Sequence, residues 1–224
     1  LGVLAGDHIK SAGELKKPLV AIGLLWSQGY TRQLIGPDGK PFDEFPEYKH
    51  PSLTDTGVVV RVMLVDHEVS CRVFECTAYG NSPLFLLDPI AERDRWVTRR
   101  LYGGGAEDRV AQEILLGIGG VRALRALGYQ PEVYHFNEGH AVFAGIELIC
   151  EQMERGATFE TAWQSIRSKV VFTTHTPVPA GNESHSHATL ARLGATRMLS
   201  YEQMAAIGGD PFNMTVAGLR LSRK

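Results

Sequence analysis

Two histidines and a glutamate lie within six residues in the segment HFNEGH, residues 135–140. Imidazole and carboxylate groups this close together can form an acid–base site or a metal cluster. The spacing disfavours a metal, because a predicted strand-to-helix turn separates His135 from His140 and the i, i+4 step of a helical zinc motif is missing. We predict that the segment lines a ligand pocket. The alternative is a structural turn in which Asn137 caps the following helix, and the two roles are compatible.

Another histidine follows a second predicted strand, in the segment TTHTPVPAG at residues 173–181. Two prolines stiffen this segment. It forms either a rigid loop that holds His175 toward a substrate or a proline-rich connection with a solvent-facing histidine, and the segment alone favours neither. Further along the chain, His185 and His187 lie in the polar stretch NESHSH, and we predict that both are solvated loop residues.

Three consecutive glycines occur in the segment LYGGGAEDR, residues 101–109. This segment is either a mobile gate beside a site or an ordinary linker between helices. It is not a phosphate-binding P-loop, because no GK[ST] follows it. The sequence also has no GxGxxG after a predicted strand and no GxSxG, so neither nucleotide binding nor a serine nucleophile is supported by those motifs.

The charge balance disfavours two classes of partner. The chain has 23 Lys and Arg against 25 Asp and Glu, and it has no basic block of the kind that nucleic acid or an anionic membrane surface requires. Cys71, Cys76 and Cys150 show no CxxC spacing, which is typical of reduced thiols. No apolar run has the length of a signal-peptide core or a membrane span, so we expect a cytoplasmic protein.

The hydrophobic period divides the chain into three regions. Residues 1–35 show a loop, a short helical pattern and an apolar strand. Residues 36–93 form a β-rich excursion, in which a long surface segment precedes three apolar runs. Residues 94–224 form a core of βαβ type.

Within this core, strands are predicted at residues 133–136 and 170–174, with two helices between them. A βαβ unit implies a parallel sheet, in which the loops after both strands emerge at one edge beside the ligand crevice. We therefore expect His140 and His175 to line one concavity.

Apolar residues at steps of three and four predict a long helix over residues 110–127, with Gly128 just beyond its end. Gly117, Gly119 and Gly120 lie inside this helix. Each glycine weakens a helix by up to about 1 kcal/mol relative to alanine. Their presence therefore predicts close packing against a neighbouring backbone.

Five segments resemble the α-glucan phosphorylase family and occur in the family's order: LGVLAGDHIKSAGEL, RLYGGGAEDRVAQEILLGIGGVRALRALG, VYHFNEGHAVFAGIELI, VVFTTHTPVPAG and FNMTVAGLRLSR. The resemblance implies an α/β fold with a Rossmann-like parallel sheet and helices on both of its faces. It also implies the first half of a two-domain glycosyltransferase of the GT-B type. Residues 1–224 would then be a partial N-terminal domain of a longer protein, with the C-terminal cofactor domain absent, and residues 1–6 would form the family's glycine-rich turn.

The resemblance also implies roles for individual residues. His175 is implied to be catalytic, with its backbone carbonyl facing the reacting anomeric carbon. The residues implied to bind substrate are Asn137, Glu138, His140 and Thr176, together with Leu1 and Gly2 of the loop that approaches phosphate. No metal ligand and no cofactor-binding residue is implied within this chain. Asn182 and Glu183 depart from the pair that the family usually has there.

The implied reaction is the phosphorolysis of α-1,4-glucan by inorganic phosphate, which releases glucose 1-phosphate from the non-reducing end with retained configuration. The family's cofactor is pyridoxal phosphate, which acts through its phosphate group, and the lysine that binds it has no counterpart in this sequence. The chain alone is therefore expected to be inactive. Two alternative functions remain: a non-catalytic glucan-binding domain and a sugar-nucleotide glycosyltransferase of the same architecture. The protein could also form a homo-oligomer.

Overall fold

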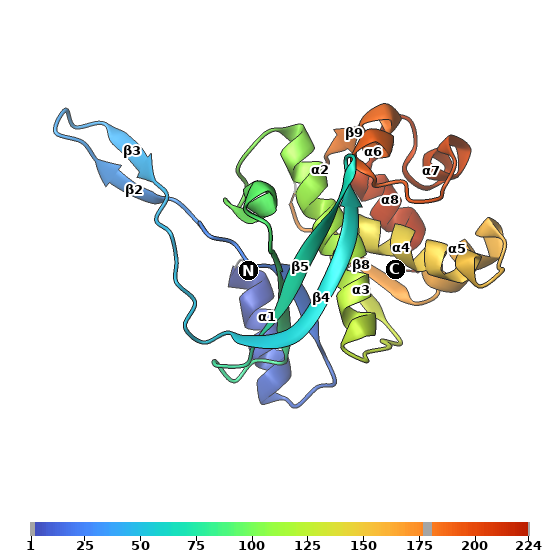
Figure 1. Cartoon of the computed structure of the whole chain (residues 1–224), viewed down its shortest axis with the longest axis horizontal. Helices are drawn as coiled ribbons and strands as arrows, with labels where there is room; N and C mark the ends of the chain where they lie inside the picture. The colour runs from blue at the N-terminus through green and yellow to red at the C-terminus, as the bar shows by residue number, and fades with distance from the viewer. Residues whose placement is uncertain (1–2, 177–180, 224) are drawn as a thin grey trace.

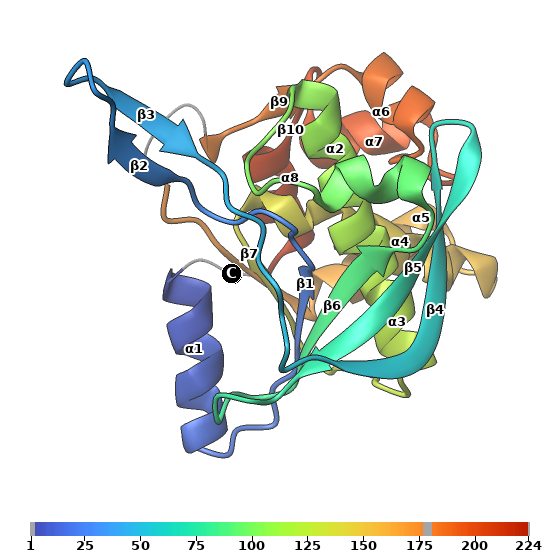
Figure 2. The same ribbon diagram turned by 60° about the vertical axis from the view of Figure 1, so that its left-hand side comes forward.

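The largest sheet in the computed structural model, which describes residues 3–176 and 181–223, has four strands in the order β1–β6–β5–β4 (Figures 1 and 2). These strands are β1 (Ala21–Leu24), β4 (Thr54–Leu64), β5 (His67–Cys76) and β6 (Leu84–Pro89). β1 runs parallel to β6, whereas β5 runs antiparallel to both of its neighbours.

The sheet is mixed, whereas the resemblance implies a Rossmann-like parallel sheet beside a β-rich excursion. Only Val65 and Asp66 join β4 to β5, and so short a connection must reverse the direction of the chain. A parallel connection would need a crossover of a dozen or more residues. The sheet is therefore parallel only where β1 meets β6.

The prediction of helices on both faces is correct for only part of this sheet. On the outer face of β4, Val59 and Met63 are 47% and 48% exposed. Near β6, by contrast, Ile9 of helix α1 (Val3–Glu14) packs with Cys76 and Leu84 in a small second core. The long β4–β5 hairpin thus faces solvent on one side, as antiparallel sheets often do.

The predicted βαβ unit is confirmed. β7 (Tyr134–Asn137) and β8 (Val170–Thr173) pair in parallel, and helices α4 (Val142–Glu154) and α5 (Phe159–Arg167) connect them. Because Asn137 lies opposite Thr173 at the end of the pair, the segments after both strands leave at the same edge.

One long helical segment packs between the mixed sheet and α4 (Figure 2). It comprises α2 (Ala106–Ile114), a π-helical turn (Leu115–Gly119) and α3 (Gly120–Ala126). The predicted close packing is confirmed, because a Cβ on Gly117 would lie 2.5 Å from the backbone nitrogen of Ala144 in α4. The π turn was not predicted, and it lies where Gly117 meets that backbone.

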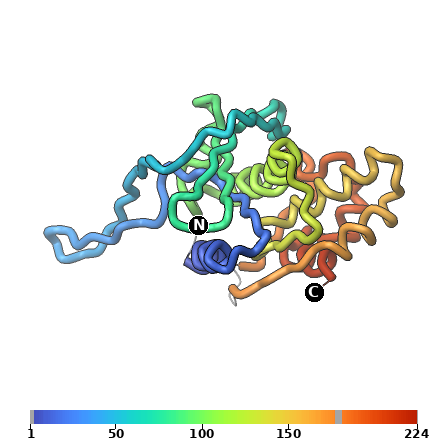
Figure 3. Tube along the Cα trace, turned by 90° about the horizontal axis from the view of Figure 1, so that it is seen from below, coloured from blue at the N-terminus to red at the C-terminus, as the bar shows by residue number. Residues whose placement is uncertain are grey.

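Two features of the N-terminal region differ from prediction. Helix α1 already begins at Val3, so the turn expected over residues 1–6 is wrong from Val3 onward, and Leu1 and Gly2 lie outside the described residues. β2 (Arg32–Ile35) and β3 (Pro41–Glu44) form an exposed hairpin that projects from the body of the molecule (Figures 1 and 3). A surface excursion was expected there, but its hairpin was not.

The residues after β8 form a helical cap. Its elements are β9 (Ser184–His185), α6 (His187–Leu193), α7 (Tyr201–Gly208), β10 (Phe212–Asn213) and α8 (Met214–Leu221). The segment FNMTVAGLRLSR contains β10 and α8, and the N-terminus of α8 is capped because the Asn213 side chain accepts the N–H of Val216. No helix in the two described ranges is both long and apolar enough to cross a membrane.

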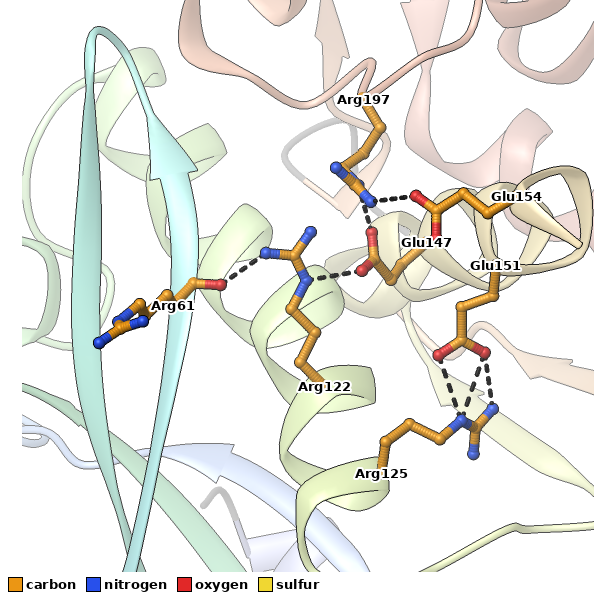
Figure 4. Close-up of polar contacts among 7 residues, drawn as sticks. All are labelled: Arg61, Arg122, Arg125, Glu147, Glu151, Glu154 and Arg197. Carbon is orange, nitrogen blue, oxygen red and sulfur yellow. Dashed lines mark hydrogen bonds and ion pairs between the residues drawn. The ribbon is translucent and has the colours of Figure 1, made fainter.

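A buried carboxylate on α4 ties three elements together (Figure 4). Glu147, with a side chain only 4% exposed, accepts hydrogen bonds from Arg122 on α3 at 2.6 Å and from Arg197 at 2.5 Å. Arg122 also donates to the backbone carbonyl of Arg61 in β4 at 2.5 Å. The network fixes the sheet, α3 and α4 relative to one another.

Candidate functional site

A cavity of about 760 Å³ opens between β1 and β7. Its apolar lining includes Leu116 of the π turn and Val121 and Leu124 of α3. Its polar wall lies at the carboxyl ends of the strands and includes Asn137, Glu138, His140, His175 and Thr176. The predicted convergence of His140 and His175 in one concavity is confirmed.

Within the part of the chain that the structure describes, the two strands that flank this cavity are each paired on one side only. In β1 the amides of Ala21 and Leu25 donate to Pro83 and Leu87 on the β6 side. In β7 the amides of Tyr134 and Glu138 donate to Lys169 and Thr173 on the β8 side. Because backbone groups alternate in direction along a strand, Ile22 and Leu24 in β1 and His135 and Asn137 in β7 turn their N–H and C=O groups toward the cavity.

Glu138 joins the two loops at the polar wall. Its Oε1 atom accepts the backbone N–H of His175 at 2.7 Å and the hydroxyl of Thr176 at 2.8 Å. Burial of the carboxyl acts to raise its pKa, but the hydrogen bonds from His175 and Thr176 lower it and prevail, so the pKa of Glu138 lies below its ordinary value. An ionised carboxylate therefore holds the loop after β8 against the loop after β7.

Asn137 orients the side chain of His175. Its Oδ1 atom lies 2.9 Å from Nε2 of His175, within hydrogen-bonding distance. Asn137 does not cap the following helix, as the alternative prediction held, because the residue at the start of α4 is Ala141 and no side chain caps it. A short 3₁₀ turn, Gly139–Ala141, comes between the strand and α4 and carries His140 to the wall of the cavity.

His135, the first histidine of the HFNEGH segment, lies away from His140. Its Nε2 atom is 2.8 Å from the hydroxyl of Thr173, and its ring is 5.6 Å from that of His8 on α1. Burial, together with the nearby His8, lowers the pKa of His135. The two histidines of the segment therefore occupy different environments and form no common metal cluster with each other.

Behind His140 lies a buried acid that sequence analysis missed. Oε1 of Glu113, on α2, is 3.1 Å from Nδ1 of His140, and the Glu113 side chain is only 4% exposed. Burial raises the pKa of Glu113 above its ordinary value, against the lowering effect of His140. Glu113 follows Arg109 by four residues, so the two side chains share one face of α2. This pair of charged residues was the sequence feature that could have indicated a polar helix face at the site.

Arg109 is held by an acid from the distant C-terminal cap. Its Nε and Nη2 atoms lie 3.2 and 3.0 Å from Oε1 of Glu183, and its guanidinium carbon is 5.3 Å from the centre of the Tyr102 ring. Arg109 and Tyr102 both line the cavity. Neither residue was predicted to be part of the site.

His185 is buried and not solvated, so the prediction for it is wrong. It pairs with Phe212 across the β9–β10 ladder, which draws its side chain inward. The prediction is also wrong for His187, whose side chain is only 9% exposed and whose Nε2 is 2.8 Å from the carbonyl of Gly209. Glu113, Glu183 and His185 bring one potential ligand atom each within 4.8 Å of one another, although Arg109 already neutralises Glu183.

The three-glycine segment directly precedes α2, and Gly105 is the N-cap residue of this helix. Gly104 adopts a φ of +87°, and the N–H of Gly105 donates to the side chain of Asp108. This geometry caps the helix, as expected for a linker between helical segments. The gate interpretation has no support in these contacts.

Pyridoxal phosphate, the cofactor that the resemblance implies, is normally held through its aldehyde by a lysine amine. No lysine lines the cavity among the described residues. The residues present therefore do not supply an anchor for this cofactor.

Comparison with known proteins found no family model that matches the chain. The chain is 42% identical over 238 aligned residues to the maltodextrin phosphorylase of Thermococcus litoralis, a match that covers 99% of this chain and 28% of that protein. It is 43% identical over 256 aligned residues to the glycogen phosphorylase of Mycobacterium tuberculosis, with 100% and 30% covered. The glycogen phosphorylase of Aquifex aeolicus is 28% identical over 245 aligned residues.

The chain spans less than a third of the length of the first two of these relatives. The similarity nevertheless extends over the whole chain and includes the segments that form the cavity wall. The chain is therefore homologous to one segment of the glycogen and maltodextrin phosphorylases.

Proposed function

We propose that this chain is the N-terminal-domain segment of an α-glucan phosphorylase of the GT-B type. The observation that carries the proposal is the identity of 42–43% to proteins named maltodextrin and glycogen phosphorylase over essentially the whole chain. The convergence of the two histidine-bearing loops on one cavity supports it. The proposed substrates are α-1,4-glucan and inorganic phosphate, and the proposed location is the cytoplasm.

In the proposed reaction, an oxygen of inorganic phosphate forms a bond to the anomeric carbon of the terminal glucose. The bond between that carbon and the glycosidic oxygen breaks, and the leaving oxygen takes up a proton. The products are glucose 1-phosphate and a glucan shortened by one residue. Pyridoxal phosphate, which the family implies, would supply acid–base chemistry through its phosphate group and would be held by residues outside this chain.

We assign the catalytic role to His175. Asn137 and Glu138 hold this residue from two sides, through its ring and its backbone N–H. A fixed backbone carbonyl at this position would stabilise positive charge that develops at the anomeric carbon. Preorganisation of this kind is effective because the dipole does not have to reorient during the reaction.

We assign substrate binding to the remaining polar wall, that is, to Asn137, His140 and Thr176. Glu138 belongs to the same wall, but its Oε1 atom is already occupied by His175 and Thr176. Its contribution is therefore to position the loop. Leu1 and Gly2, proposed to approach the phosphate, lie outside the described residues, and their roles stay predictions.

The test is an assay of the full-length parent protein with α-glucan and inorganic phosphate. We expect release of glucose 1-phosphate, and we expect His175→Ala to lower kcat/KM by about 10- to 1000-fold, as for the loss of one oriented electrostatic contact. His50→Ala is the control, since His50 contacts the backbone of Trp26 and does not line the cavity. Turnover of a sugar nucleotide without phosphorolysis, or a His175→Ala variant with unchanged kinetics, would refute the proposal.

A further inference from the structure

The buried carboxylate of Glu113 faces Nδ1 of His140, a histidine that lines the cavity. Oε1 of Glu113 lies 3.1 Å from Nδ1 of His140. The Glu113 side chain is 4% exposed, whereas the imidazole of His140 is 37% exposed and lines the cavity. One ring nitrogen of His140 is thus directed at protein, and Nε2 is the nitrogen left for a ligand.

Glu113 needs a donor at this position. A carboxylate removed from water is costly unless it accepts hydrogen bonds, and the second oxygen of Glu113 is buried without a partner among the described residues. Nδ1 of His140 is the donor that the structure brings to the first oxygen. A bond from N–H to a carboxylate is charge-assisted, and it is stronger than a bond between two neutral groups.

Arg109 also lies near Nδ1 of His140, with its Nη2 atom at 3.4 Å. A guanidinium can only donate, so Nδ1 would have to be unprotonated to accept from it. Nδ1 cannot donate to Glu113 and accept from Arg109 at once. The contact with Glu113 is shorter, and Arg109 is already engaged by Glu183 at 3.0 Å, so the geometry favours a proton on Nδ1.

We propose that Glu113 is a positioning residue that holds His140 in the Nδ1–H tautomer, so that unprotonated Nε2 faces the cavity as a hydrogen-bond acceptor. The tautomer of a histidine is set in this way by the bond that its other nitrogen makes. An acceptor at this position selects a ligand group that donates, and a sugar hydroxyl can do so. Only this identification of the ligand rests on the proposed function.

The direct test is nuclear magnetic resonance of the 224-residue chain with ¹⁵N-labelled histidine, at a pH where His140 is neutral. The signals of His140 are assigned by their loss in His140→Gln. We expect the shifts of a protonated Nδ1 and an unprotonated Nε2. In Glu113→Leu, which has similar size and no acceptor, we expect the Nε2–H form, whereas Glu113→Gln keeps an acceptor oxygen and should keep the Nδ1–H form.

A wild-type His140 protonated on Nε2 would overturn the proposal, because a protonated Glu113 would then be the donor. An unchanged tautomer in Glu113→Leu would overturn it as well. If Glu113→Leu does not fold, the wild-type and Glu113→Gln spectra still decide the question. None of these measurements depends on activity, so they can succeed or fail independently of the proposed function.

A second readout is available in the full-length parent. In metal sites, loss of a residue that hydrogen-bonds to a ligating histidine typically lowers metal affinity or activity by about 10- to 100-fold. We expect a fall of that order in kcat/KM for Glu113→Leu. Glu113→Gln should retain most of the activity. If the role of Glu113 is purely structural, Glu113→Leu should lower stability. Leu and Gln variants of equal stability should then have equal kcat/KM.

Discussion

Glu138 combines an unusual backbone conformation with a side chain that joins two loops. Its φ and ψ are +66° and 178°, a region that is essentially restricted to glycine. Its carboxylate meanwhile accepts from His175 and Thr176. Glycine would adopt this backbone conformation without strain. The hydrogen bonds that the Glu138 carboxylate accepts must therefore compensate for the backbone strain of a non-glycine residue at this position.

Two substitutions separate these opposing effects. Glu138→Ala removes the acceptor and keeps the strain, and it should lower the free energy of unfolding by about 1–3 kcal/mol, the cost of leaving buried donors unpaired. Glu138→Gly removes the acceptor and the strain together, and it should be more stable than Glu138→Ala by about 1 kcal/mol. Urea denaturation of the chain measures both. Equal stability of the two variants would show that the backbone at residue 138 is unstrained.

The same carboxylate predicts a dependence on pH. Because the folded pKa of Glu138 lies below its ordinary value, its contribution to stability is complete above the ordinary value and is lost as the pH falls through the lower, folded value. The difference in unfolding free energy between wild type and Glu138→Ala should therefore shrink in acid. A difference that grows in acid would contradict this assignment.

The residues of the site were predictable to different degrees. His140 and His175 follow predicted strands, and the edge rule for parallel strands places such residues together. Glu113 lines the cavity from a helix face, and Glu183 of the C-terminal cap pairs with the cavity residue Arg109. The two acids are 70 positions apart in the sequence, and no local pattern relates them. Their role depends on tertiary packing, which the hydrophobic period does not encode.

At the scale of secondary structure, the glycines of the long helical segment pack against neighbours of different kinds. A Cβ on Gly117 would lie 2.5 Å from a backbone nitrogen and 2.7 Å from a backbone carbon of α4. A Cβ on Gly119 would instead meet the end of the Leu87 side chain, at 2.9 Å. Backbone cannot move aside as easily as a side-chain methyl group can.

Gly117→Ala should therefore lower the free energy of unfolding by about 1–3 kcal/mol, the usual cost of overpacking. Gly119→Ala is the matched control in the same turn of helix. Its steric cost is offset by the gain in helix propensity of up to about 1 kcal/mol, so the net change should be small. Chemical denaturation of both variants gives the comparison. A Gly119→Ala variant that is destabilised as much as Gly117→Ala would show that the contact with α4 is not special.

The strands themselves were largely predicted, because apolar runs bounded by turn residues mark β4, β5, β6, β7 and β8. Their pairing was predicted only for β7 and β8, where helical patterns between the strands imply a parallel crossover. The direction of β5 was missed because the turn at Val65 and Asp66 has no glycine or asparagine to mark it. The β2–β3 hairpin was missed because its strands are short and almost wholly exposed, so they have no hydrophobic period.

At the scale of the whole molecule, the proposed function makes this chain one wall of a larger site, and none of the described lysines lines its cavity. We expect the 224-residue chain alone to show no absorbance band from bound pyridoxal phosphate and to release no glucose 1-phosphate from α-glucan. The parent protein, assayed in parallel, serves as the positive control. Cofactor binding or turnover by the isolated chain would mean that the cavity between β1 and β7 is a complete site.

The half-paired strands beside the cavity also determine how the backbone exchanges its protons with solvent. In β1 the amides of Ala21 and Leu25 are bonded to the β6 side, whereas those of Ile22 and Leu24 point to the cavity. Deuterium uptake in the isolated chain should therefore alternate along this strand, slow at residues 21 and 25 and fast at 22 and 24. In β7 the same alternation places His135 and Asn137 among the fast amides. Anything that fills the cavity with hydrogen-bonding groups would slow only the fast set, so the exchange pattern reports cavity occupancy residue by residue.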